Sequence, residues 1–219
     1  MAGKRAPLSA ERIETKALDL IEREGLEKFS TRKLATALGC EAMSIYHYFP
    51  SKAHLMDAIL DRIVGEVPIP PDDLGWRERL RQVAFGYRAM ALRYPAFFRF
   101  MAHHRMNTRT ALALLERILS IFDDAGFGTE DTARLFRLFS YYITGAALDE
   151  ATGYAKGPSA AEAVPGAEVA RDYPLVTAVN PYFKSEHHEA TFALGLEMLL
   201  DGMERRYREA AAEPAASIG

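Results

Sequence analysis

The amino-acid sequence predicts an all-α fold, with an N-terminal three-helix unit followed by a larger helical domain. Three observations lead to this prediction. Apolar residues recur at helical spacing in every strongly patterned segment, no segment alternates apolar and polar residues as a half-buried strand does, and no hairpin turn joins two such segments. A chain of 219 residues with 49% hydrophobic residues can also bury a substantial core.

The first predicted helix runs from about Ser9 to Arg23. Its apolar side chains fall on one face, and Gly25 follows the last turn as a helix terminator. The residues on this face are Ile13, Ala17, Leu20 and Ile21. We expect this helix to support the two short helices that come next.

Residues 30–52 have the pattern of two short helices joined by a glycine turn. Ser30 can cap the first helix, small Ala35 allows the second to approach closely, and Gly39 supplies the positive φ of the turn. Ile45 then anchors the second helix inward. This spacing is typical of a helix-turn-helix unit that binds DNA.

The start of the first short helix is suited to binding a phosphate group. Thr31, Arg32 and Lys33 place a hydroxyl and two cations beside the free N–H groups of a helix N-terminus. We assign Thr31 and Arg32 to the DNA backbone rather than to the bases. Lys52, in the first turn of the next helix, is expected to bind a phosphate as well.

The second short helix, about Glu41 to Phe49, is the expected reading helix. Ile45 and Phe49 lie four residues apart and turn inward, which leaves the other side chains outside. The candidates for contacts with DNA are Ala42, Met43, Ser44, Tyr46, His47 and Tyr48. Since none of them is Arg, Asn or Gln, bidentate base recognition comes from elsewhere or is absent.

A linking helix is predicted after Pro50, with Ser51 as its cap, and it ends before Pro68. Its apolar residues are Leu55, Ile59 and Ile63. Any tilt of this helix would move the reading helix relative to its counterpart in a partner chain.

Ten residues of this region match the pattern of a known family: Phe29, Thr31, Arg32, Leu34, Ala35, Leu38, Gly39, Tyr46, Phe49 and Lys52. With them, residues 10–60 resemble the N-terminal domain of the TetR (tetracycline-repressor) family of transcriptional regulators. Cys40 departs from the usual aliphatic residue, and His47 and Tyr48 stand where a variable residue and a histidine are common. The resemblance implies a regulator of transcription whose common mode is repression.

The rest of the chain is also predicted to be helical, over about 80–94, 97–101, 108–124, 129–152 and 185–211. Seven Gly and Pro residues interrupt the pattern over 153–184, which predicts a long mobile loop with a short helix near 173–179. Residues 76–206 resemble the tetracycline-repressor type of ligand domain, notably over 128–150 and 192–203.

The helices over 130–152 and 185–211 carry apolar residues on more than one face, so each needs two packing partners. We expect one partner to be the core and the other a second copy of the chain, in a four-helix homodimer interface that the family resemblance also implies. Such a dimer would present two reading helices to successive major grooves, about 34–36 Å apart on a palindromic double-stranded DNA operator.

The larger domain is rich in aromatic and apolar residues that could enclose a small-molecule site. The candidate ligand-binding residues are Tyr87, Phe97, Met101, Leu115, Phe139 and Tyr142. They favour a small hydrophobic or aromatic effector whose binding weakens both half-sites of the operator together. The alternative is a DNA-binding regulator without a small-molecule effector, controlled by a protein partner or constitutive.

A helical-bundle metalloenzyme is a remote alternative, because histidines occur within Glu186–Glu189 and as His103 and His104. Adjacent histidines on a helix point about 100° apart, and neither a Glu-x-x-His nor a His-Glu-x-x-His spacing occurs. Asp149 and Glu150 also diverge as helix neighbours, and we interpret them as helix-end charges. We therefore expect no enzyme activity, no metal site and no cofactor.

The net charge of −3 does not exclude DNA binding, because the acidic residues lie mainly after residue 62, and affinity depends on local cations.

The single cysteine, Cys40, excludes an intramolecular disulfide, and we expect it to be a small buried hydrophobe. No apolar run could cross a bilayer, and no apolar signal core follows Lys4 and Arg5. We therefore expect a cytoplasmic protein that does not contact membranes.

The expected organisation has five parts. They are a disordered basic arm (1–8), a helix-turn-helix DNA-binding domain with its linking helix (9–64), a helical effector-binding and dimerisation domain (65–212), the mobile loop within that domain (153–184), and a disordered tail (213–219).

Overall fold

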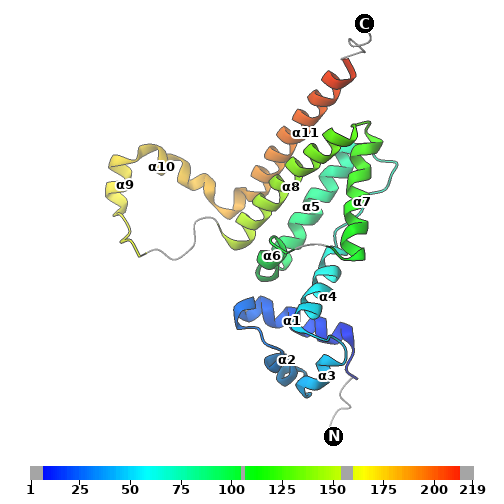
Figure 1. Ribbon diagram of the computed structural model, residues 1–219. Coiled ribbons are helices and arrows are strands. Elements are labelled where there is room, and N and C mark those ends of the chain that lie inside the picture. The colour runs from blue at the N-terminus through cyan, green and yellow to red at the C-terminus, as the bar shows by residue number, and fades with distance from the viewer. Residues whose placement is uncertain (1–6, 105–106, 154–159, 213–219) are drawn as a thin grey trace.

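The computed structural model describes residues 7–104, 107–153 and 160–212, and within these ranges every regular element is a helix (Figure 1). The all-α prediction is therefore confirmed. The α-helices are α1 (Ala10–Glu24), α2 (Thr31–Leu38), α3 (Ala42–Tyr46), α4 (Lys52–Val64), α5 (Trp76–Arg93), α6 (Pro95–Met101), α7 (Arg109–Asp124), α8 (Thr129–Thr152), α9 (Gly166–Asp172), α10 (Pro174–Val179) and α11 (His188–Ala212). Three short 3-10 helices are η1 (Leu26–Lys28), η2 (Asn180–Phe183) and η3 (Ser185–His187).

Three of the first four helices begin at a serine cap. The side-chain oxygens of Ser9, Ser30 and Ser51 each accept a hydrogen bond from the backbone N–H three residues further on, at the starts of α1, α2 and α4. Gly39 ends α2 in the left-handed conformation, with φ 68° and ψ 39°, as the turn requires. The reading helix is shorter than predicted, because α3 ends at Tyr46 and the chain continues as a turn.

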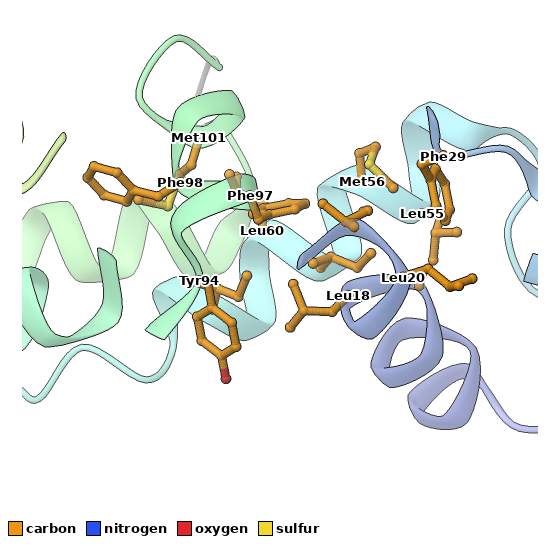
Figure 2. Close-up of a cluster of buried hydrophobic side chains, with 14 of the residues drawn as sticks. Leu18, Leu20, Phe29, Leu55, Met56, Leu60, Tyr94, Phe97, Phe98 and Met101 are labelled. Atoms are coloured by element: carbon orange, nitrogen blue, oxygen red, sulfur yellow. The ribbon is translucent and has the colours of Figure 1, made fainter. Parts of the chain in front are cut away.

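One hydrophobic core joins the N-terminal unit, α1 to α4, to the rest of the molecule. α4 contributes the buried side chains of Leu55, Ile59 and Leu60 to this core. Phe97 and Phe98 of α6 enter the same core from the C-terminal domain (Figure 2). The linking helix is therefore a structural element that both domains share.

Carboxylates of the N-terminal unit hold both ends of the α6 segment. Glu22 of α1 accepts hydrogen bonds from the backbone N–H groups of Ala96 at 3.0 Å and Phe97 at 2.8 Å, which caps the helix. After the end of α6, His104 Nε2 lies 2.9 Å from Asp57 Oδ1 on α4. A displacement of α6 would therefore act on α1 and α4 together.

The C-terminal domain is a bundle in which α5, α7, α8 and α11 enclose a second core (Figure 1). Phe122 of α7, Phe139 of α8 and Leu196 of α11 are almost completely buried there. Among the residues described, no helix is long and apolar enough to cross a membrane.

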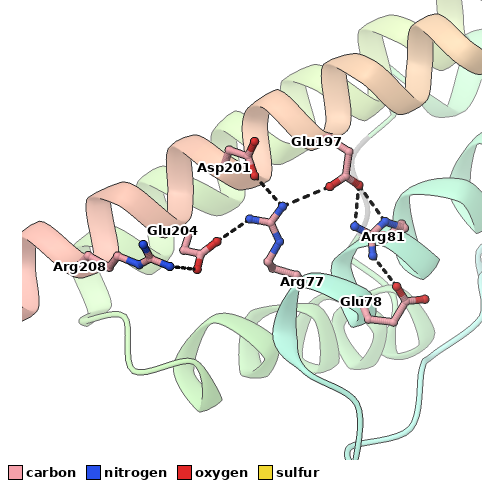
Figure 3. A network of polar contacts seen from close by, with 7 residues as sticks. All are labelled: Arg77, Glu78, Arg81, Glu197, Asp201, Glu204 and Arg208. Atoms are coloured by element: carbon pink, nitrogen blue, oxygen red, sulfur yellow. Dashed lines mark hydrogen bonds and ion pairs between the residues drawn. The ribbon is translucent and has the colours of Figure 1, made fainter.

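An ionic network joins α5 to α11 outside this core (Figure 3). The Arg77 guanidinium donates to Asp201 and Glu204 at 2.7 Å each and to Glu197 at 3.2 Å. Arg81 Nε donates to the same Glu197 at 2.8 Å. The hydrogen bond to Asp201 raises the pKa of Arg77, so its guanidinium group stays charged.

The segment predicted as a mobile loop, 153–184, is largely helical in its described part. The short helix predicted near 173–179 is confirmed as α10, which begins at Pro174, whereas α9, with Pro165 as its N-cap, was not predicted. We call residues 160–187 the side arm; its α9 and α10 have no buried residue and lie to one side of the bundle (Figure 1). α11 accordingly begins at His188 rather than Ser185.

Candidate nucleic-acid interface and ligand cavity

The six side chains predicted to face outward from the reading helix lie around α3 and the turn after it. Met43 is 64% exposed, and Tyr46, His47 and Tyr48 are also exposed. Ala42 and Ser44 are half-buried at the edge of this surface. The predicted anchors are buried in the core, with Ile45 1% and Phe49 7% exposed. The exposed surface of α3 is therefore uncharged and rich in aromatic rings.

The predicted phosphate-binding residues lie at the N-terminus of α2. Arg32 is exposed, Thr31 is half-buried, and Lys33 Nζ pairs with Glu24 Oε2 of α1 at 3.3 Å. Hydrogen bonds from Arg23 and Lys33 lower the pKa of Glu24. Lys33 is exposed as well, and of these two cations only Lys33 forms an ion pair with another described residue.

Two predicted DNA contacts also bind the chain itself. The hydroxyl of Tyr48 donates to the carbonyl oxygen of Leu8 at 2.7 Å, which fastens the segment before α1 to the end of the reading region. Lys52 Nζ donates to the carbonyl oxygen of Phe29 at 3.2 Å and lies 5.2 Å from that ring's centroid. Because an ammonium group has three N–H donors, Lys52 can still donate to a phosphate. The arm residues Lys4 and Arg5 lie outside the described residues.

A cavity of about 390 Å³ lies where the C-terminal half of α8, the start of α11 and η2 meet. Aromatic side chains form much of its wall: Tyr142, Tyr182, Phe183 and Phe192. Asp149, Glu150, His188 and Thr191 supply its polar groups. The volume lies in the usual range of small-molecule sites, about 300–1,000 Å³.

Contacts between α8 and α11 fix one wall of this cavity. The Tyr142 hydroxyl donates to the carbonyl oxygen of Phe192 at 2.6 Å, and the two rings stack with centroids 5.6 Å apart. Gly195 allows this arrangement, since a Cβ there would lie 2.5 Å from the Tyr142 hydroxyl oxygen. Burial raises the pKa of Tyr142, so the hydroxyl keeps its proton and its hydrogen bond near neutral pH.

Arg88 of α5 binds carboxylates at the polar end of the cavity and holds them in place. Its Nε and Nη2 each donate to the Glu150 carboxylate at 2.7 Å, and its Nη1 donates to Glu189 at 3.3 Å. The hydrogen bonds to Glu150 raise the pKa of Arg88. The guanidinium carbon also lies 5.6 Å from the Phe192 ring centroid, and His188 Nδ1 lies 3.8 Å from Glu150 Oε1.

The six residues predicted to bind a ligand do not surround this cavity together. Tyr142 lines it, whereas Phe97 and Met101 belong to the core shared by the two domains and Phe139 to the bundle core. Tyr87 packs against both cores, with its hydroxyl 3.3 Å from Thr144 Oγ1, and Leu115 is half-buried on α7. Sequence reasoning missed the other wall residues, because it assigned η2 to a loop and Asp149 and Glu150 to helix-end charge.

The cysteine takes part in packing, and three of the histidines that the sequence offered as functional candidates lie beside carboxylates. Cys40 is half-buried and packs against the shared core. Within the described ranges, no three His, Cys, Asp or Glu residues are grouped in a way that could hold a metal ion. His104 pairs with Asp57, and His187 and His188 lie beside Glu186 and Glu150.

α8 and α11 also expose apolar side chains on the face turned away from the bundle core. These are Leu138 and Tyr141 of α8 and Leu194 and Met198 of α11, each at least 50% exposed. They are spaced by three or four residues along their helices, so each pair forms part of one stripe. We call these four residues the exposed stripe.

The capped three-helix unit with an exposed α3, joined to a helical bundle that contains a cavity, defines a helix-turn-helix transcriptional regulator. Residues 13–59 match the family model described as bacterial regulatory proteins, tetR family, and residues 67–207 match the tetracyclin repressor-like C-terminal domain. The chain belongs to the TetR family. Both parts of the resemblance seen in the sequence are thereby confirmed.

Curated relatives agree with this assignment. The chain is 31% identical over 195 residues to the tetracycline repressor protein class A from transposon 1721 of Escherichia coli, an alignment that covers 87% of this chain and 88% of the relative. It is 26% identical over 215 residues to the HTH-type transcriptional repressor DrrR1 of Streptomyces coeruleorubidus, covering 92% and 79%. Both relatives are named as repressors, and membership of the TetR family makes this chain a transcriptional regulator.

Solved structures share the whole fold. A possible TetR family transcriptional regulator from Streptomyces coelicolor A3(2) matches with a TM-score of 0.73 at 27% identity, covering 90% of this chain and 99% of the other. The Streptomyces coelicolor TetR family protein ActR, in complex with (S)-DNPA, matches with a TM-score of 0.68 at 25% identity, covering 90% and 98%.

Proposed function

We propose that this regulator is an effector-responsive repressor, which binds a palindromic operator as a homodimer in the cytoplasm and leaves it when a small hydrophobic or aromatic compound binds. The observation that carries the proposal is the core shared through α4, because it connects the reading region to the ligand-binding domain without a flexible linker. A change in the bundle can therefore reach α3 through packed side chains.

The DNA-binding half of the proposal rests on α3 and the N-terminus of α2. Arg32 and Thr31 would hold the phosphate backbone, while Met43, Ser44 and Tyr46 contact base edges. Since this surface offers no bidentate side chain, specificity would depend on the spacing of two half-sites and on DNA shape.

The exposed stripe supports the homodimer. Four large apolar side chains on two adjacent helices would remain in water in a monomer, whereas a two-fold axis beside α8 and α11 would pack them against their own copies. The resulting four-helix interface would fix the distance between the two reading helices.

Support for an effector comes from the cavity and from the relatives. ActR is a TetR family protein seen in complex with (S)-DNPA, so a fold of this kind accommodates a small organic ligand. In this chain the cavity is bounded by α8 and α11, the same helices that carry the exposed stripe. A ligand there could alter the dimer geometry and so the separation of the reading helices.

A two-part experiment tests the proposal. Light scattering coupled to size exclusion gives the mass of the full chain, and a gel-shift titration with duplex DNA from upstream of its own gene gives operator affinity. We expect the protein to be a dimer that forms one defined complex with the DNA. At least one compound from a panel of lipophilic compounds should dissociate this complex and raise the melting temperature of the free protein. Operator binding that no compound alters would favour the regulator without an effector, and a monomer would contradict the dimer.

A further inference from the structure

We infer that the cavity between α8, α11 and η2 takes a lipophilic organic cation, a compound with an aromatic body and a positively charged amine or onium centre. The inference rests on the proposed function, because it names the chemical class of the effector. It goes beyond that function by giving the effector a positive charge and by naming the residues of the cavity that would bind it.

The aromatic wall provides one reason. Tyr182 and Phe183 are 68% and 66% exposed although they border a cavity that Tyr142 and Phe192 close from the other side. An apolar ligand would cover this exposed aromatic surface. The electron-rich faces of such rings also attract a cation, by about 0.5–2 kcal/mol per contact.

The charges at the polar end provide the second reason. Asp149, Glu150 and Glu189 bring three carboxylates to this end, opposed by the single guanidinium of Arg88. The group therefore stays negative whether or not His188 is protonated. A cation entering the cavity is attracted and an anion is repelled.

Arg88 cannot act as an anion receptor here. All three guanidinium nitrogens donate to Glu150 or Glu189, and the residue is only 9% exposed. Asp149, by contrast, is exposed at the cavity and has no ion pair with the described residues. Its carboxylate is the group left to meet a charged ligand.

Two probes of nearly the same shape and opposite charge test this inference. Tetraphenylphosphonium and tetraphenylborate are titrated separately into the full-length protein in sodium buffer, without DNA, and binding is measured by calorimetry. We expect the phosphonium cation to bind at least about tenfold more tightly than the borate anion. Equal affinity, tighter binding of the anion or no binding of either probe would overturn the inference.

Substitutions locate the effect. Asp149→Asn removes an exposed carboxylate at the cavity, and Glu116→Gln removes an exposed carboxylate on α7, so both change the net charge equally. We expect Asp149→Asn to weaken phosphonium binding about fivefold to tenfold and Glu116→Gln to leave it unchanged. Equal effects of the two variants would show a general charge effect and overturn the site.

A second variant tests the aromatic wall without touching a buried group. Tyr182→Leu keeps an apolar side chain on η2 but removes the ring, and we expect phosphonium affinity to fall severalfold with the melting temperature unchanged. Unchanged affinity would contradict the aromatic contact. If other compounds release the operator while these probes do not bind, the inference fails and the proposed function stands.

Discussion

Two tyrosines at the end of the reading region have different surroundings. The Tyr48 hydroxyl is satisfied by the carbonyl oxygen of Leu8, whereas the Tyr46 hydroxyl has no hydrogen bond to the described residues. A hydroxyl bonded within the chain contributes to stability, and one that faces water is available to DNA. Sequence reasoning assigned both to DNA, because nothing in the local pattern places Leu8 beside a residue 40 positions away.

Matched removal of the two hydroxyls tests this difference. We expect Tyr48→Phe to lower the free energy of unfolding by about 0.5–1.5 kcal/mol. Tyr46→Phe should change it by less than about 0.5 kcal/mol but weaken operator binding severalfold. Urea unfolding measures the free energy of unfolding, and fluorescence anisotropy with labelled operator measures the affinity for DNA. A loss of stability in Tyr46→Phe together with a loss of operator affinity in Tyr48→Phe would contradict these roles.

The raised pKa of Tyr142 predicts a pH dependence at the cavity wall. Burial favours the protonated hydroxyl in the folded chain, so its contribution is complete below the pKa of an unfolded tyrosine, about 10. As the pH rises beyond that value towards the folded-state pKa, this contribution is lost. The unfolding free energy of the wild type should therefore fall more steeply than that of Tyr142→Phe as the pH rises above about 10; parallel curves would contradict this.

Among the elements, α6 depends on a residue outside its own domain. Glu22 of α1 supplies the carboxylate that caps its first turn. We expect Glu22→Ala to lower the free energy of unfolding by about 0.5–2 kcal/mol, the usual range for losing a helix cap. Glu27→Ala, which removes an exposed carboxylate in the neighbouring η1, is the control and should have little effect. Equal losses from both variants in a chemical unfolding titration would argue against the cap.

α11 contains two glycines that provide a matched pair of substitutions. A Cβ at Gly195 would lie 2.5 Å from the Tyr142 hydroxyl, whereas the nearest atom to a Cβ at Gly202 is Arg205 Nη2 at 4.0 Å. We expect Gly195→Ala to displace Tyr142, lower the unfolding free energy by about 1–3 kcal/mol and impair ligand binding. Gly202→Ala should be neutral or stabilising, because alanine favours the helix. Thermal melts of both variants test this prediction, and equal melting temperatures of the two variants would contradict it.

The sequence predicted features that depend on neighbouring residues better than features that depend on residues far apart in the chain. Caps and turns are local, so the sequence predicted the cap residues Ser30 and Ser51 and the turn at Gly39 correctly. In the side arm, the short helix predicted near 173–179 is present as α10, whereas α9 was missed because Pro165 can either interrupt a helix or precede one as its cap. The cavity joins α8, α11 and η2, and no periodicity predicts which side chains of separate helices meet.

At the scale of the whole molecule, the exposed stripe predicts the oligomeric state. Met198→Glu places a charge in the proposed interface, and Leu112→Glu changes another exposed apolar residue, on α7. We expect the first variant to become monomeric. Its operator affinity should fall at least about a hundredfold, because a monomer contacts one half-site whereas a dimer contacts two at once. The second should remain a dimer, as measured by light scattering. A dimeric Met198→Glu protein would place the interface elsewhere.

The core shared through α4 also determines how the chain unfolds and how it can be divided. Leu55, Ile59 and Leu60 are buried in the core that the two halves share, so a fragment ending at residue 64 would expose the part of α4 that lies beside Phe97 (Figure 2). Such a fragment should expose apolar surface and melt below the intact chain. The full-length protein should instead lose both halves in one calorimetric transition. We therefore expect the reading unit to lose stability when it is transferred to another protein without its bundle, and a fragment that melts at the temperature of the intact chain would contradict this.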